Sequence, residues 1–120
     1  EIGLFVRSSR QLGRARGAVV AAALEFVEID GSGDVQDGCV AVGTMERAKG
    51  LEFRAVAVAA GDDDVIPSQA RIDEIGDYAD LEEVWETERQ LLYVACTRAR
   101  DHLLVTGVAP GSEFLEDLTG

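Results

Sequence analysis

The chain contains four short runs of apolar residues. Longer stretches, in which apolar residues recur at the spacing of a helix, separate these runs. An uninterrupted apolar run of roughly four to eight residues is typical of a strand that is buried on both faces of a sheet. On this basis the sequence predicts strands at residues 2–6, 40–43, 55–60 and 102–106.

Two long helices are predicted between these strands. The first begins after Ser8, which forms the pattern of a capping box with Gln11, and its apolar stripe consists of Leu12, Ala15, Val19, Ala22 and Phe26. Asp80 and Glu83 suit the start of the second helix, which runs to about Arg98 and buries Val84, Leu91, Leu92 and Ala95. Shorter helical segments are expected at residues 45–51 and 112–118, and polar connections at residues 30–38 and 61–78.

This alternation of strands and helices predicts an α/β fold with a mostly parallel sheet and helices on both faces. With 120 residues, 47% of them apolar, the chain is expected to form a single domain with one core over residues 1–120. The first residue is Glu1 and not Met, which indicates a piece of a longer protein.

The net charge is strongly acidic at −12, but it is unevenly distributed. Residues 62–88 hold eleven acids against one base, Arg71, so that segment alone carries −10. The remainder is close to neutral, and its N-terminal part holds Arg7, Arg10, Arg14 and Arg16. Both clusters are most simply interpreted as solvated surface, and the total charge is weak evidence against nucleic-acid binding.

Composition also disfavours several classes of protein. No apolar run approaches the roughly 20 residues that span a bilayer, so no membrane partner is expected. Cys39 and Cys96 lie far apart, without a CxxC pattern or a histidine beside them. A metal site and a disulfide framework are therefore not expected, and a reducing cytoplasm fits best.

Arg98 is the first candidate for chemistry because it lies where the long helix ends, shortly before the last strand. A guanidinium is always charged and offers a planar fork of donors, which suits a phosphate better than an ammonium does. The alternative is that Arg98 only complements the negative end of its helix dipole, and spacing alone favours that simpler role. Arg100, just beyond, suits the dipole role better.

Lys49 is the only lysine among eleven basic residues. This bias indicates a position where a compact ammonium is preferred, although chance is a fair alternative for one residue. Gly50 allows a sharp exit or a close approach of the backbone. Glu52 suits hydrogen bonds to sugar hydroxyls, and its simpler interpretation is an exposed acid at a helix end.

Two longer motifs resemble those of a known family. The segment T-x-x-x-A-K-G-L-E-F at residues 44–53 resembles motif V of the UvrD/Rep family of superfamily-one DNA helicases. The segment E-R-Q-L-L-Y-V-A-C-T-R-A at residues 88–99 resembles motif VI, and Ile66, Pro67 and Ser68 are similar to the sequence that follows motif V. Covering roughly residues 40–106, the resemblance implies a RecA-like three-layer domain, the C-terminal member of the pair that clamps ATP.

By this resemblance, Arg98 matches the arginine finger that contacts the γ-phosphate of ATP. Glu52 matches the glutamate that reaches the ribose, and Lys49 and Gly50 lie in the same nucleotide-facing turn. Thr44 matches a residue beside the backbone of single-stranded DNA. The resemblance therefore implies an ATP-dependent helicase, in which the N-terminal RecA-like domain of the same protein holds most of the ATP and Mg²⁺.

Two further parts of motif VI carry other expectations. Glu88 and Arg89 match its polar start, for which a structural or coupling role is expected. Tyr93 fits the motif as well and is most simply a core residue whose hydroxyl needs one partner.

The chain also departs from the family pattern. Family members usually have histidine at the position of Glu46, and a carboxylate beside a phosphate backbone disfavours DNA contact. The large subdomain often inserted ahead of motif V has no room in residues 31–38, and the Walker A loop, the Walker B acids and the motif IV arginine are absent. The chain alone is therefore expected to lack helicase-like ATPase activity.

Two alternatives remain open. The domain could be a degenerate helicase-like module that binds or regulates without motor activity, which Glu46 and the acidic segment favour. Arg98, Lys49 and Glu52 favour the motor instead. A stand-alone nucleotide-binding domain is the third hypothesis, and the missing phosphate loop argues against it.

Overall fold

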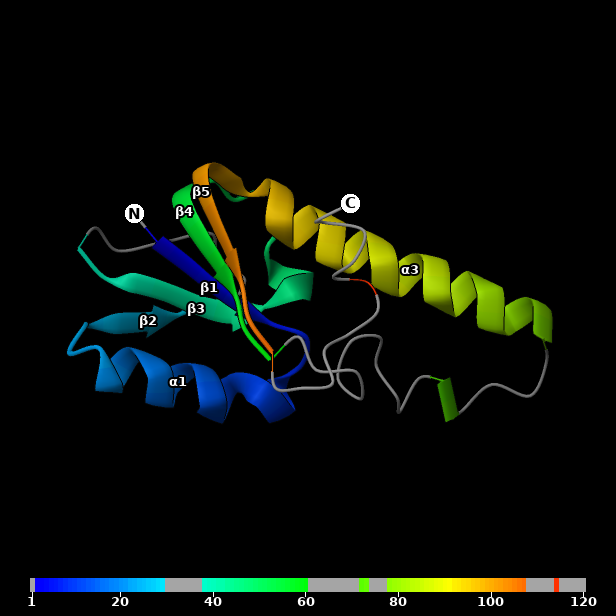
Figure 1. Cartoon of the computed structure of the whole chain (residues 1–120), viewed down its shortest axis with the longest axis horizontal. Helices are drawn as coiled ribbons and strands as arrows, with labels where there is room; N and C mark the ends of the chain where they lie inside the picture. The colour runs from blue at the N-terminus through cyan, green and yellow to red at the C-terminus, as the bar shows by residue number, and fades with distance from the viewer. Residues whose placement is uncertain (1, 30–37, 61–71, 74–77, 108–113, 115–120) are drawn as a thin grey trace.

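Five parallel strands form one sheet, with helices above and below it (Figure 1). The computed structural model describes residues 2–29, 38–60, 72–73, 78–107 and 114. Along the chain the strands are β1 (Ile2–Val6), β2 (Phe26–Glu28), β3 (Val40–Thr44), β4 (Phe53–Val58) and β5 (Ala99–Val105). Their spatial order is β2-β3-β1-β4-β5, and all neighbours are parallel. The predicted α/β class is confirmed.

Helices α1 (Leu12–Ala21) and α3 (Tyr78–Thr97) cover opposite faces of this sheet. Two short 3-10 turns, η1 (Ser9–Gln11) and η2 (Met45–Arg47), lead into α1 and out of β3. Because successive side chains of a strand point to opposite faces, each central strand contributes to both cores. Against α1 pack Leu4, Val6, Val40 and Val42. Against α3 pack Phe5, Ala41, Val56 and Val58, with Leu92, Ala95 and Cys96 from the helix itself.

Tight packing between β1 and β4 explains the glycine in β1. A Cβ atom at Gly3 would lie 2.8 Å from Cδ2 of Phe53, closer than real contacts allow. The rings of Phe5 and Phe53 meet edge to face beside it, with centroids 5.8 Å apart. These two rings fill the α3 side of the sheet where a larger residue at position 3 would stand.

Helix α1 is shorter than its apolar stripe indicated. The helix ends at Ala21, and Ala23 adopts a left-handed backbone conformation with φ of 58°. This turn redirects the chain, so Phe26 begins β2, a strand that the sequence did not predict. The prediction of a capping box is also wrong. The Ser8 side chain makes no capping hydrogen bond, and Gln11 Oε1 accepts a hydrogen bond from Arg14 instead.

Helix α3 starts at Tyr78, so Asp80 lies inside it and does not cap it. Its predicted buried side is confirmed, with Leu92 and Ala95 fully buried and Val84 and Leu91 partly so. The helical turn predicted at residues 45–51 is confirmed only at Met45–Arg47, where it forms η2. The predictions for residues 30–37 and 66–68 lie outside the described residues, and of the predicted helix at 112–118 only Phe114 is described.

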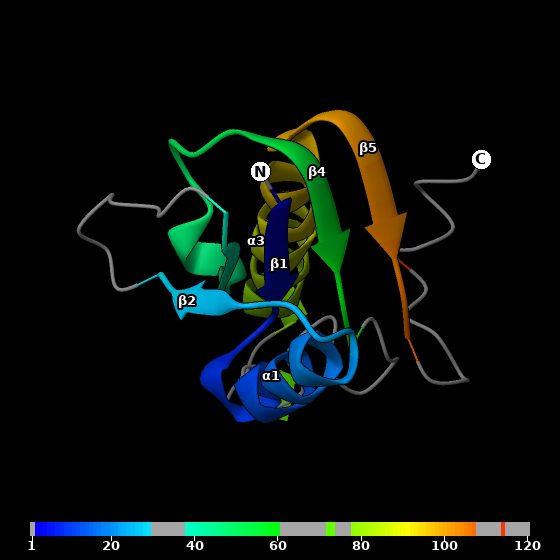
Figure 2. The same cartoon turned by 90° about the vertical axis from the view of Figure 1, so that its left-hand side faces the viewer.

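Strand β5 lies at an outer edge of the described sheet (Figure 2). Leu103 and Leu104, which point to opposite faces, are 44% and 60% exposed. Neither face of β5 is therefore fully covered within this chain. Among the described residues, no helix combines the length and hydropathy that a bilayer crossing requires.

Candidate functional site

The predicted site residues lie at two opposite edges of the sheet. Thr44 ends β3 opposite Val6, at the carboxyl edge of the parallel strands. Phe53 and Ala99, which follow Glu52 and Arg98, pair at the amino edge. Ligands of open α/β sheets usually bind at the carboxyl edge. Glu52 and Arg98 lie at the opposite, amino edge.

At the amino edge, motif V and the end of motif VI lie side by side. The N–H of Phe53 donates to the carbonyl of Arg98 at 2.9 Å, which joins the two segments directly. Arg98 Nη1 reaches the carbonyl of Leu51 at 3.5 Å, and its Nε reaches the carbonyl of Val94 at 3.2 Å. Helix α3 ends at Thr97, whose hydroxyl oxygen accepts from Arg98 Nη2 at 3.2 Å.

The guanidinium of Arg98 is half-buried and has no carboxylate partner among the described residues. Carbonyl and hydroxyl oxygens hold it in place without neutralising its charge. A positioned, uncompensated guanidinium has the chemistry that an incoming anion requires. The bond to Val94, one of the last carbonyls of α3, also suits a helix-end role, whereas the bond to Leu51 ties the same guanidinium to motif V.

The rest of the predicted nucleotide-facing turn is exposed beside it. Lys49 and Glu52 are exposed, and Gly50 has φ of 83°, the left-handed conformation that favours glycine. Arg100, expected to serve the helix dipole, lies in β5 and approaches Glu52 at 3.9 Å. Both of these side chains are more than half exposed, so water screens this long ion pair. The amino edge thus gathers Lys49, Gly50, Glu52 and Arg98.

The carboxyl edge holds a buried ion pair that the sequence did not reveal. Arg7, directly after β1, donates from Nε and Nη2 to the two carboxylate oxygens of Glu88 at 2.8 and 2.5 Å. The Arg7 side chain is 6% exposed and that of Glu88 is fully buried. Burial lowers the pKa of Arg7, but Glu88 and, less strongly, Glu46 outweigh it, so the pKa is raised. The expectation that Arg7 belongs to a solvated surface cluster is wrong.

A signal for half of this pair was present in the sequence. Glu88 lies four and seven residues before Leu92 and Ala95, which places an acid on the buried stripe of α3. An acid in such a position requires a buried cation. Nothing in the local sequence identified Arg7, 81 residues away, as that cation.

Glu46 and Thr44 lie next to this pair. Glu46 accepts from Arg7 Nη1 at 3.0 Å while its side chain stays 63% exposed. Thr44 precedes η2, and its hydroxyl makes no capping bond to that turn. Because Arg7 also binds Glu88, the three side chains together keep a net negative charge next to Thr44, and such a charge disfavours contact with a phosphate backbone.

Two other parts of motif VI point outward. Tyr93 is 64% exposed, so the expectation of a core residue is wrong. Arg89 lies over the ring of Phe114, with Cζ 5.0 Å from the ring centroid, and approaches Glu86 at 3.7 Å.

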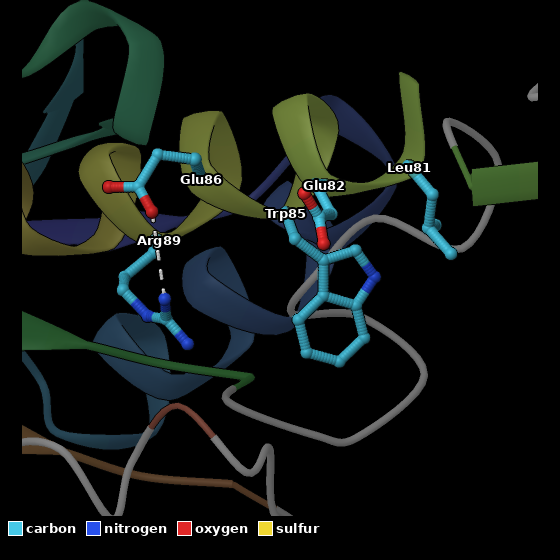
Figure 3. Close-up of a pocket in the computed structure, with 5 residues that line it drawn as sticks. All are labelled: Leu81, Glu82, Trp85, Glu86 and Arg89. Carbon is cyan, nitrogen blue, oxygen red and sulfur yellow. Dashed lines mark ion pairs between the residues drawn. The ribbon is translucent and has the colours of Figure 1, made fainter. Parts of the chain in front are cut away.

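An open hollow of about 480 Å³ lies along the N-terminal part of α3 (Figure 3). It is lined by Leu81, Glu82, Trp85, Glu86 and Arg89, and the indole of Trp85 meets Phe114 edge to face at 5.2 Å. None of the residues predicted to contact nucleotide or DNA lines it. In the described part of the chain, no cluster of three or more His, Cys, Asp or Glu side chains suits a metal ion.

Comparison with known proteins decides the family. A model of the UvrD-like helicase C-terminal domain matches residues 19–109. The chain belongs to this family. The match covers both motifs and only the end of α1, so the resemblance recognised in motifs V and VI is confirmed at the level of the domain.

The UvrD-like domain is similar to named helicases over part of their length. It is 41% identical to DNA helicase II of Escherichia coli over 85 residues, which is 71% of this chain and 11% of that protein. It is 38% identical to DNA helicase II of Rickettsia typhi over 79 residues, which is 66% of this chain and 11% of that protein. The chain therefore spans about a tenth of the length of these relatives.

A solved structure supports the same assignment. The UvrD-like domain superposes with a TM-score of 0.64 on the C-terminal domain of a possible DNA helicase from Lactobacillus plantarum WCFS1, at 26% sequence identity. The superposition covers 95% of this chain and 60% of that one.

Proposed function

We propose that this UvrD-like domain is the second motor domain of an ATP-dependent DNA helicase or translocase. In this proposal residues 1–120 belong to a longer protein, whose N-terminal RecA-like domain binds ATP and Mg²⁺. Arg98 then completes the ATP site from the opposite side. The observation that carries the proposal is the half-buried guanidinium of Arg98, held by backbone oxygens without a carboxylate partner among the described residues.

Each amino-edge residue has a distinct chemical role in the proposal. Arg98 stabilises the negative charge that develops on the transferred phosphoryl group, and it needs little reorganisation because Leu51 and Val94 already orient it. Glu52 accepts hydrogen bonds from the ribose hydroxyls. Lys49 and the left-handed Gly50 bring positive charge and an unobstructed backbone to the same ligand.

Single-stranded DNA binds at the other edge in this proposal. Thr44 lies at the carboxyl end of β3, away from the nucleotide-facing turn, and offers a hydroxyl to a backbone phosphate. Alternating closure of the two motor domains on ATP then moves the protein along the strand. In this proposal DNA and nucleotide therefore contact the domain at opposite edges of the same parallel sheet.

Replacing Arg98 by Ala in the full-length protein tests the proposal. Loss of an arginine finger lowers kcat by roughly 10³–10⁵. The fold should persist, because the lost hydrogen bonds lie at a half-exposed helix end. The matched control is Arg16→Ala, which removes an exposed arginine from α1 and should leave turnover unchanged.

The variant Arg98→Lys adds a second measurement. It keeps a positive charge but loses the planar fork, so it should recover little of the turnover. If Arg98→Ala retains turnover within a few fold of wild type, the finger assignment is wrong. An unmutated full-length protein that binds DNA without hydrolysing ATP would instead support the degenerate binding module, which Glu46 favours.

A further inference from the structure

Three segments that are distant in sequence meet at one guanidinium. Arg7 follows β1, Glu88 lies in the middle of α3, and Glu46 lies in η2. All three guanidinium nitrogen atoms of Arg7 donate hydrogen bonds. Nε and Nη2 donate to Glu88, and Nη1 donates to Glu46. The contact therefore joins the helix of motif VI to the turn of motif V at the carboxyl edge.

Both ends of this contact lie near residues of the proposed motor site. Glu46 is two residues from Thr44, and it is exposed where DNA is proposed to bind. Arg98 directly follows the end of this helix, ten residues after Glu88, which is about 15 Å along the helix axis. Because a continuous helix moves as a unit, a displacement at Glu88 is carried to Arg98.

We propose that Arg7 is a positioning residue that couples DNA contact at the η2 turn to the placement of Arg98. A guanidinium fork is planar and rigid, so a shift of Glu46 reorients the same group that holds Glu88. The position of α3, and with it Arg98, then depends on what binds beside Glu46. This inference rests on the proposed function and adds the link between its two ligand sites.

Stability alone does not account for the arrangement. Apolar residues of similar volume generally stabilise a core as well as a buried ion pair does. A pair kept only for the core would also not need a third, exposed carboxylate on the same guanidinium. Glu46 connects the buried pair to the surface, and that connection is what a coupling device requires.

The experiment uses the full-length protein and a variant that removes both buried charges, Arg7→Met with Glu88→Met. We expect this double variant to keep its ATPase rate without DNA. Stimulation by single-stranded DNA should fall about ten-fold, within the roughly 5–150-fold range of coupling between sites. The affinity for a fluorescent oligonucleotide should stay unchanged, which separates lost coupling from lost binding. Arg16→Met with Glu28→Met is the matched control, an exposed pair that should leave stimulation intact.

A second variant keeps the test decisive if the double variant does not fold. Glu46→Gln alters only the exposed arm of the contact, and it should reduce stimulation several-fold while basal turnover and the melting temperature stay the same. Full stimulation in the folded double variant, or in Glu46→Gln, would overturn the coupling and leave the motor proposal standing. Absence of any ATPase activity in the wild-type protein would overturn both.

Discussion

The buried pair between Arg7 and Glu88 allows a quantitative test of the packing between β1 and α3. The Arg7 side chain is 6% exposed, that of Glu88 is not exposed, and two hydrogen bonds of 2.8 and 2.5 Å join them. Replacing Arg7 by Met leaves a carboxylate buried without its cation. Loss of one partner from such a pair costs about 3–5 kcal/mol. A typical domain has only about 5–15 kcal/mol in total, so this substitution should remove a large part of the stability.

The double variant is expected to behave differently from the single ones. With Met at both positions no charge remains buried, and apolar pairs of similar volume are often neutral or stabilising relative to the ion pair. Most of the loss in Arg7→Met should therefore be recovered in Arg7→Met with Glu88→Met. The exposed pair of Arg16 and Glu28, whose side chains are 45% and 44% exposed, provides the reference. Arg16→Met should cost no more than about 1 kcal/mol.

Urea unfolding at neutral pH measures these differences in the 120-residue chain. Trp85 is the only tryptophan and packs against Phe114, so its fluorescence reports unfolding around α3, and circular dichroism reports the helices. The reasoning is refuted if Arg7→Met costs no more than Arg16→Met. It is also refuted if the losses of the two single variants simply add in the double variant.

Three further predictions concern single positions. Glu52→Gln in the full-length protein should raise KM for ATP roughly ten-fold with little change in kcat, because one hydrogen bond to a charged group is lost; an unchanged KM would exclude the ribose contact. Burial raises the pKa of Cys96 from 9.0 to about 11, so stability is complete below about pH 9 and falls as the pH rises through 11. Cys96→Ala should lose this pH-dependent difference in urea unfolding. Gly17→Ala, in open space on α1, should stabilise the domain by about 0.5–1 kcal/mol. Gly3→Ala should destabilise it by about 1–3 kcal/mol because the added Cβ meets Phe53. Melting temperatures equal to that of the wild type would contradict both predictions.

The sequence predicted those parts of the fold that depend on local patterns. Four of the five described strands contain a short apolar run, and their parallel arrangement follows from the helices between them. Strand β2 was missed because it has only three residues and its first, Phe26, continues the helical spacing of α1. The left-handed conformation of Ala23, which ends that spacing, has no signal in an alanine side chain.

The sequence supplied the members of the candidate site, whose roles stay predictions, but only part of their arrangement. Motifs V and VI identified Glu52 and Arg98, and the fold brings them together at the pairing of Phe53 with Ala99. Their location at the amino edge follows from their positions directly before β4 and β5, because these two strands are parallel. The partnership of Arg7 with Glu88 depends on packing between segments 81 residues apart, which no single-sequence pattern reports.

Strand β5, at an edge of the described sheet, has a practical consequence for anyone who prepares this domain alone. Leu103 and Leu104 expose apolar surface on its two sides, next to the polar residues Arg100, Asp101 and His102, and a strand at a sheet edge offers backbone groups to another extended chain. Isolated copies should self-associate through β5 as concentration rises. Charged substitutions at these two leucines would be the first remedy for poor behaviour in concentrated samples.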